Sequence, residues 1–259
     1  NIVDFCFFIC YNEVTKALEA VMENIKVIAM DLDGTLTQHK TPLSDEHRAV
    51  LEALSKKYKL LMVGAGMCHR IFNQLGKFPI DIIGSYGMQY AEYNAESGEI
   101  DIVFDEVRPC DRAHMEERVS AMREKYGFTE FAGENVEYHS SGCVTFPVLG
   151  TKAKQEDKLA FDPDRSKRRA IYDDIKSVFS DYTVFVGGSS SFDMAPFPFD
   201  KAYALSKYCD EHGIAHDEVV YIGDDYGLGG NDESVYKSDI PYLTIDDYRT
   251  FPEVVKELL

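Results

Sequence analysis

Short apolar runs alternate with amphipathic segments along the first part of the chain. Residues 26–30, 59–63 and 80–83 are almost free of polar side chains, which is typical of strands buried on both faces. The segment after Ser44 begins with a common helix N-cap residue and continues with apolar residues at helical spacing. This alternation of strand and helix predicts an α/β fold with a doubly wound, parallel, Rossmann-like sheet.

The alternation stops after residue 107 and returns after Pro198. The intervening residues read as mixed strands and two helices without strict alternation, so we expect a separate α+β module inserted into the first domain. Residues 152–158 are expected to form a loop rich in lysine. The predicted division is an N-terminal appendage without assigned function (1–21), a catalytic core (22–107 and 188–259) and an inserted cap (108–187).

The composition limits the possible partners. The chain has 259 residues and a formal net charge of −18, which argues against nucleic acid and anionic membrane surfaces. No apolar run approaches the length of a membrane span. The six cysteines lack C-x-x-C or zinc-type spacing, so we expect reduced thiols in a cytoplasmic protein. Any anionic substrate would have to be held by local cations, a divalent metal or backbone N–H groups.

The run DLDGTLT at residues 31–37 is the strongest chemical signal. Asp31 and Asp33 follow a buried strand directly, and ligands of parallel sheets bind beyond the carboxyl ends of their strands. The turn at Gly34 lets the two carboxylates converge on one metal and one substrate. An EF-hand calcium loop is excluded, because the run lacks its sixth-position glycine, its twelfth-position glutamate and a preceding helix.

This run resembles the first motif of the haloacid dehalogenase superfamily of phosphatases and phosphomutases. The other motifs of the superfamily have counterparts in the same order. Gly64-Ala65-Gly66 stands where a serine or threonine is usual, so backbone N–H groups would hold the phosphate. Lys201 corresponds to the motif lysine, and the acidic loop at residues 223–232 corresponds to the fourth motif, with Asp224, Asn231 and Asp232.

Within the superfamily, the chain is most similar to the eukaryotic-type phosphomannomutases. The long fourth motif, with its G-G-N-D and following tyrosine, is close to theirs, and Ser191-Phe192-Asp193 matches their S-F-D. Two arginines of that family's cap, which grip the distal phosphate of a bisphosphorylated sugar, are absent. Ser140 and Thr151 stand in their places, and nearby lysines cannot reproduce bidentate recognition.

The resemblance implies a mechanism and a set of residues. Asp31 would be the nucleophile that forms an aspartyl-phosphate, and Asp33 the general acid and base. Mg²⁺ would be held by Asp31, Asp33, Asp224 and Asp232, in part through the Asp33 backbone carbonyl. The remaining predicted contacts are phosphate binding by Gly64, Ala65, Gly66, Lys201 and Asn231, and substrate binding by Thr151, Ser191 and Asp193.

Three functions are compatible with these residues. Because the two cap arginines are missing, we favour a Mg²⁺-dependent phosphatase that hydrolyses a small phosphorylated metabolite, most simply a sugar phosphate. The alternative is a phosphomannomutase-like sugar phosphomutase. A catalytically silent binding protein on the same fold is the third, and the intact acidic motifs speak against it. A monomer and a homodimer joined through the cap are both compatible with the sequence.

Overall fold

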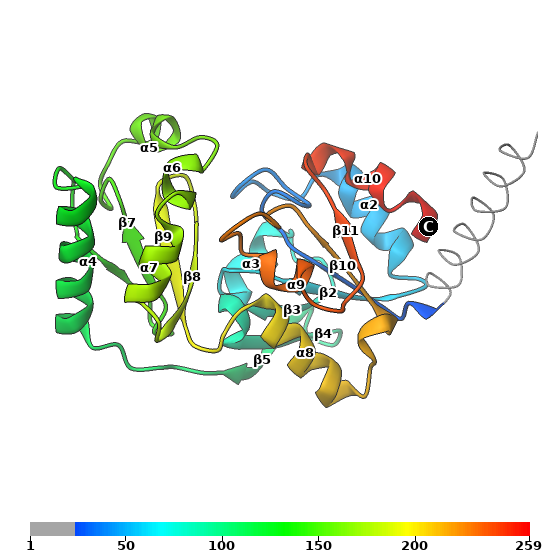
Figure 1. The fold of residues 1–259 in the computed structure, drawn as a ribbon. Helices are drawn as coiled ribbons and strands as arrows, with labels where there is room; N and C mark the ends of the chain where they lie inside the picture. The colour runs from blue at the N-terminus through cyan, green and yellow to red at the C-terminus, as the bar shows by residue number, and fades with distance from the viewer. Residues whose placement is uncertain (1–23) are drawn as a thin grey trace, which may run out of the picture.

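The computed structural model describes residues 24–259, and the predicted appendage at residues 1–21 lies outside them. Two sheets lie side by side and are joined by two chain crossings, before α4 and after β9 (Figure 1). We call the larger sheet with its helices the core and the smaller sheet with its helices the cap. The core strands are β1 (Val27–Met30), β2 (Lys59–Val63), β3 (Asp81–Gly84), β4 (Gln89–Asn94), β5 (Glu99–Asp105), β10 (Val219–Gly223) and β11 (Tyr242–Thr244).

The core sheet has the strand order β11-β10-β1-β2-β3-β4-β5. The first five of these are parallel, and β4 and β5 form an antiparallel hairpin at the edge. The core helices are α2 (Asp45–Leu54), α3 (Cys68–Gln74), α8 (Lys201–His212), α9 (Glu233–Tyr236) and α10 (Phe251–Val254). β1 is the middle one of the five parallel strands, so the residue that follows it, Asp31, lies at the middle of their carboxyl edge.

The core sheet is covered on both faces. Ile28 and Met30 point into one apolar cluster, which contains residues of α2, α3 and α10, and Val27 and Ala29 point into another, which contains residues of α8. Because both faces of β1 are buried, the side chains on both faces are apolar, and the strand shows a continuous apolar run instead of alternating apolar and polar residues. The predicted doubly wound parallel sheet is therefore confirmed.

Local signals explain where several helices begin and end. The Ser44 hydroxyl accepts a hydrogen bond from the N–H of His47 at 3.1 Å, as expected for an N-cap. Helix α8 begins after Asp200, whose carboxylate accepts from the N–H of Tyr203, and ends at Gly213 with a φ of 64°. The Asp200 cap fixes the first residue of α8, which is Lys201.

The cap sheet is antiparallel, in the order β6-β7-β9-β8. Its strands are β6 (Glu137–Tyr138), β7 (Val144–Pro147), β8 (Tyr182–Phe185) and β9 (Ser191–Pro196), and its helices are α4 (Arg112–Tyr126), α5 (Gln155–Phe161), α6 (Ser166–Arg169) and α7 (Tyr172–Val178). Because β9 pairs within this sheet, it belongs to the cap, although the predicted boundary between residues 187 and 188 assigned it to the core. The division into domains otherwise stays a prediction.

Two segments differ from the sequence-based expectation. The predicted loop at residues 152–158 contains the first half of α5, and neither α5 nor α6 was anticipated. Both helices are short, and no side chain of α5 is buried, so they lack the apolar periodicity from which longer helices are predicted. Strand β4 was also missed. The four cysteines among residues 24–259 are free thiols, and no helix of that range is long and apolar enough to cross a membrane.

Candidate active site

Asp31 occupies the carboxyl end of β1, as the sequence predicts. Its N–H donates to the carbonyl of Ile222 in β10 at 3.0 Å, so the residue is still tied to the neighbouring strand. The chain then turns at Gly34, which has a φ of 108°. A Cβ atom on Gly34 would lie 2.4 Å from a carboxylate oxygen of Asp224, so only glycine allows this close approach.

Lys201 joins three polar side chains of the site. Its Nζ atom lies 2.8 Å from Asp31, 2.7 Å from Asp232 and 3.0 Å from the side-chain oxygen of Asn231. The lysine is fully buried. Burial lowers its pKa, but the ion pairs with Asp232 and Asp31 raise the pKa of Lys201 above its ordinary value, so the ammonium group stays charged.

Three of the predicted metal ligands converge. Asp31, Asp224 and Asp232 each offer one carboxylate oxygen, and these oxygens lie within 4.8 Å of one another. Burial raises the pKa of Asp31 to about 8 and that of Asp224 to about 6, and repulsion from neighbouring carboxylates adds to both shifts. A divalent cation with oxygen ligands would relieve this repulsion, so the residues fit the predicted Mg²⁺.

Asp232 is also held by the protein itself. Its carboxylate accepts hydrogen bonds from the hydroxyl of Tyr221 at 2.6 Å and from the N–H of Asp225 at 3.0 Å, besides the contact with Lys201. Asp224 accepts a bond from the hydroxyl of Thr35 at 2.9 Å. Asp224 is therefore more weakly held than Asp232 and has more free capacity to bind a cation.

The carboxylate of Asp33 points away from this cluster. It accepts hydrogen bonds from the N–H of Lys40 and the amide of Gln74, both at 2.7 Å, and faces the guanidinium of Arg70 at 3.4 Å. Although burial raises the pKa of Asp33, these three contacts lower it below its ordinary value. The carboxyl group is therefore ionised, which is the state that a general base needs.

The turn after β2 only partly matches its predicted role. The N–H of Gly64 donates to the carbonyl of Ile83 at 2.9 Å, so it belongs to the sheet and is not available for the predicted phosphate contact. The N–H groups of Ala65 and Gly66 remain the proposed donors. A Cβ atom on Gly66 would lie 2.2 Å from the Arg70 guanidinium, so Arg70 crosses this turn, a contact that the sequence did not reveal.

Two of the three predicted cap residues lie together. The carboxylate of the half-buried Asp193 accepts from the hydroxyl of Thr145 at 2.9 Å and from that of Ser191 at 3.3 Å, and desolvation raises its pKa. Thr151 makes a different contact, because its hydroxyl accepts from the N–H of Glu134 at 3.0 Å. Thr151 therefore stabilises a cap loop, and its predicted contact with substrate stays a prediction.

Tyr86 links the cap to the core. It follows β3 in the left-handed conformation, with a φ of 57°, and its ring stacks on that of Phe185 in β8 with 4.4 Å between centroids. Burial raises its pKa strongly, and both Asp193 of the cap and Asp31 of the core add to the shift. The Tyr86 ring is therefore buried where the cap meets the core. No local sequence pattern pointed to Tyr86, whose role depends on the packing of two domains.

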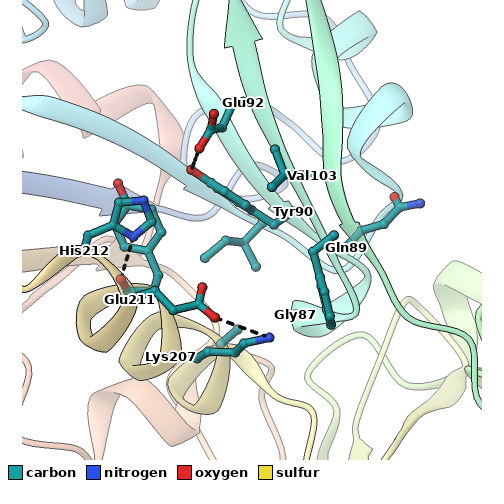
Figure 2. A pocket seen from close by; sticks show the side chains of 12 residues that line it. Gly87, Gln89, Tyr90, Glu92, Val103, Lys207, Glu211 and His212 are labelled. Atoms are coloured by element: carbon teal, nitrogen blue, oxygen red, sulfur yellow. Dashed lines mark hydrogen bonds and ion pairs between the residues drawn. The ribbon is translucent and has the colours of Figure 1, made fainter.

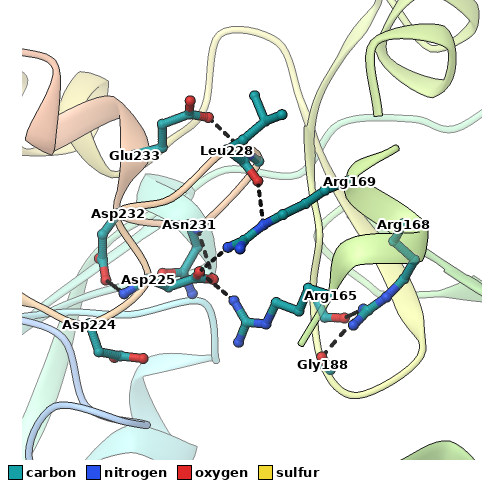
Figure 3. A network of polar contacts seen from close by, with 12 residues as sticks. Arg165, Arg168, Arg169, Gly188, Asp224, Asp225, Leu228, Asn231, Asp232 and Glu233 are labelled. Atoms are coloured by element: carbon teal, nitrogen blue, oxygen red, sulfur yellow. Dashed lines mark hydrogen bonds and ion pairs between the residues drawn. The ribbon is translucent and has the colours of Figure 1, made fainter. Parts of the chain in front are cut away.

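Two cap arginines reach the acidic loop of the core. Arg165 forms an ion pair with Asp225, and Arg169 approaches the same carboxylate at 3.8 Å. The Nε atom of Arg169 also donates to the carbonyl of Leu228 at 3.1 Å. Figure 3 shows both guanidinium groups directed from the cap at Asp225, beside Asn231. No local sequence pattern indicates these contacts.

A separate cavity of about 300 Å³ lies between α8 and the β4–β5 hairpin (Figure 2). Its lining includes Tyr90, Lys207 and His212, and none of the acidic residues described above. It is therefore not part of the candidate active site.

The chain is similar to known proteins in sequence and in fold. Residues 127–253 match the family model of the eukaryotic phosphomannomutases. Phosphomannomutases from Saccharomyces cerevisiae and Schizosaccharomyces pombe are 24% and 26% identical, over 81% of this chain and 84% of each relative. Among solved structures, an IMP-bound IMP-nucleotidase mutant from Plasmodium falciparum has a TM-score of 0.65 at 16% identity, covering 90% of this chain and 68% of its own.

A phosphatase of Bacteroides thetaiotaomicron has a TM-score of 0.58 at 16% identity, covering 90% of this chain and 95% of its own. At this level of identity the two structural likenesses concern the fold. They agree with the predicted α/β fold.

Proposed function

We propose, from the premise that the chain belongs to the haloacid dehalogenase superfamily, that it transfers a phosphoryl group of a small sugar phosphate through Asp31. The observation that carries the proposal is the contact of Lys201 with both Asp31 and Asp232, at 2.8 and 2.7 Å. A buried lysine beside a carboxylate nucleophile supplies positive charge where the transferring phosphoryl group gains negative charge.

In this proposal the Asp31 carboxylate attacks phosphorus and displaces the sugar oxygen. Lys201 and the N–H groups of Ala65 and Gly66 bind the phosphoryl oxygens. Asp31, the Asp33 backbone carbonyl and Asp224 would hold Mg²⁺, which would reduce the repulsion between the nucleophile and the anionic substrate. The fully buried position of Lys201 limits the access of water to its ammonium group.

Asp33 is the proposed general acid and base. Its carboxyl group is ionised in this structure and can accept a proton from an attacking hydroxyl group. To act as an acid it must first take up that proton, and its three donor partners oppose this. We therefore expect substrate binding to draw Asp33 away from Arg70 and Gln74 before it protonates a leaving oxygen.

We further propose that the phosphoryl group passes to a second hydroxyl of a sugar, which makes the enzyme a sugar phosphomutase. The sequence alone led us to favour hydrolysis. The family match and the named relatives support the mutase alternative better, since all of them are described as phosphomannomutases. The second candidate, a phosphatase, is favoured by Ser140 and Thr151 at the places of the two missing cap arginines.

One assay separates the two candidates. The purified protein is incubated with mannose 1-phosphate, Mg²⁺ and a small amount of the corresponding 1,6-bisphosphate, and the products are followed by phosphorus NMR. A mutase yields mannose 6-phosphate with little inorganic phosphate, whereas a phosphatase releases inorganic phosphate as its main product. If neither product forms from a panel of sugar phosphates, the proposed substrate class is wrong.

A further inference from the structure

Arg165 and Arg169 give the cap more positive charge than Asp225 can neutralise. Two guanidinium groups face a single carboxylate, and each side chain is about one third exposed, at 31% and 32%. A guanidinium offers five N–H donors, so a carboxylate shared by two of them leaves donors free for another acceptor. This excess charge is located in a protein whose net charge is −18.

The position of the two arginines is fixed by a buried ion pair. Asp162 accepts from Nε of Arg168 at 2.8 Å, and both side chains are almost completely buried. Arg168 also donates to the carbonyl of Ser191 at 2.9 Å, which ties α6 to the strand that carries Asp193. Arg165 immediately precedes α6 and has a left-handed φ of 61°. Such a conformation is unfavourable for a non-glycine residue and persists only where the surrounding contacts enforce it.

Both arginines lie at the catalytic side of the cap. Their partner Asp225 is the residue next to Asp224, and it accepts a hydrogen bond from the N–H of Asn231 at 3.3 Å. The two guanidinium groups therefore face the space between the cap and the loops that carry the proposed metal and phosphate ligands.

We propose that Arg165 and Arg169 bind a second phosphate group of the substrate, at the end that is not being transferred, and that Asp225 takes the place of this phosphate in the free enzyme. The proposal rests on the proposed phosphoryl-transfer function and names a specificity determinant for it. The site comes from α6 and differs in position from the stretches that contain Ser140 and Thr151.

The exchange of Asp225 for a phosphate is energetically reasonable. A partly exposed ion pair contributes little to stability, so breaking it opposes binding only weakly. A phosphate held by two guanidinium groups accepts several charge-assisted hydrogen bonds with the planar geometry that arginine prefers. The substrate would thus connect the cap to the core through its two phosphates.

The test measures binding without turnover, in the Asp31→Asn background. Calorimetric titration compares mannose 1,6-bisphosphate with p-nitrophenyl phosphate, which carries one phosphate and an uncharged ring. In the double variant Arg165→Gln/Arg169→Gln, we expect the bisphosphate to bind about 10-fold to 100-fold more weakly, as for the loss of 1.4 to 2.7 kcal/mol. The aryl phosphate should be affected less than about twofold.

Three further variants make the result interpretable. Arg112→Gln removes an exposed cap arginine that stacks on Tyr138, and it should leave both affinities unchanged. Asp225→Asn removes the proposed stand-in for phosphate and should strengthen the binding of the bisphosphate. The single variant Arg165→Lys keeps the positive charge, so it provides a test if the double variant does not fold. It should weaken the binding of the bisphosphate but not of the aryl phosphate, and by less than the double glutamine variant does.

The proposal would be overturned if the double variant bound both ligands more weakly by the same factor, or if its affinity for the bisphosphate were unchanged. The outcome is independent of the proposed function, because the comparison needs no chemistry. If the wild type converts no sugar phosphate while the bisphosphate still depends on the two arginines, the proposed reaction fails and the anion site stands. If sugar phosphates turn over normally in the double variant, the anion site fails and the proposed reaction stands.

Discussion

The ammonium group of Lys201 lies 2.8 Å from the carboxylate of Asp31, at the centre of the carboxyl edge of the core sheet. Lys201→Met should reduce phosphoenzyme formation by at least about 10²-fold to 10³-fold, because a preorganised charge at the transition state is lost. It should also cost about 3 kcal/mol of stability, since Asp31 and Asp232 lose a buried partner. The control is Lys207→Met on the same helix, and rapid-quench kinetics with chemical denaturation measure both effects. A phosphorylation rate equal to wild type would contradict the assignment.

Asp33→Ala should separate the two halves of the reaction. The nucleophile remains, so an activated donor such as acetyl phosphate should still phosphorylate Asp31. Release of the phosphoryl group should slow by about 10²-fold to 10⁴-fold without the general base. Intact-protein mass spectrometry should then show an accumulated phosphoenzyme, which disappears in the double variant with Asp31→Asn. Rapid release from Asp33→Ala would exclude the acid and base role.

Asp224→Asn tests the proposed metal site. Mg²⁺ at 100 times its dissociation constant should stabilise the wild type by about 2.7 kcal/mol, because it binds only the folded protein. The variant should lose most of this stabilisation, since its amide relieves the carboxylate repulsion and binds the cation poorly. Thermal unfolding with and without EDTA measures the effect, and Asp217→Asn on the surface is the matched control. An undiminished Mg²⁺ response in Asp224→Asn would place the cation elsewhere.

The Asp162–Arg168 ion pair predicts how stability depends on pH. Although burial raises the pKa of Asp162, its hydrogen bonds from Arg168 and from the N–H of Lys167 lower it below its ordinary value. A carboxyl group with a lowered pKa in the folded state stabilises the protein above its unfolded pKa of about 4, and this contribution is lost as the pH falls below it. Asp162→Asn should therefore lower stability at pH 7 and flatten the acid limb of the stability curve. Asp157→Asn on the exposed α5 serves as the control. Parallel acid limbs in wild type and Asp162→Asn would contradict the prediction.

The parts of the site that could be predicted from the sequence are those marked by a local pattern, such as the end of a strand or the start of a helix. Asp31 and Lys201 could be found because each follows a local signal, a buried apolar strand in one case and a helix start in the other. Their meeting follows from the strand order of a doubly wound sheet. The pairing of Asp31, Asp224 and Asp232 has the same origin, because β1 and β10 are neighbours.

Residues whose roles arise from contacts between domains could not be predicted. Tyr86 is buried against Phe185 of the cap, and Arg165 of the cap pairs with Asp225 of the core, so neither has a local pattern. Arg70 also has no local pattern, because its role depends on its guanidinium passing over the turn at Gly66 and contacting the carboxylate of Asp33. The N–H of Gly64 is occupied for a related reason: it donates to the carbonyl of Ile83 on the neighbouring strand, a contact between segments that the local sequence does not show.

The close approach of Gly34 to Asp224 has a consequence for protein engineering. The turn after β1 and the loop after β10 interlock so tightly that a side chain at Gly34 would collide with Asp224. Thr35 and Asp224, which are hydrogen-bonded, are separated by 189 residues of sequence. A chimera that takes one half of the core from a relative would therefore have to take the other half as well.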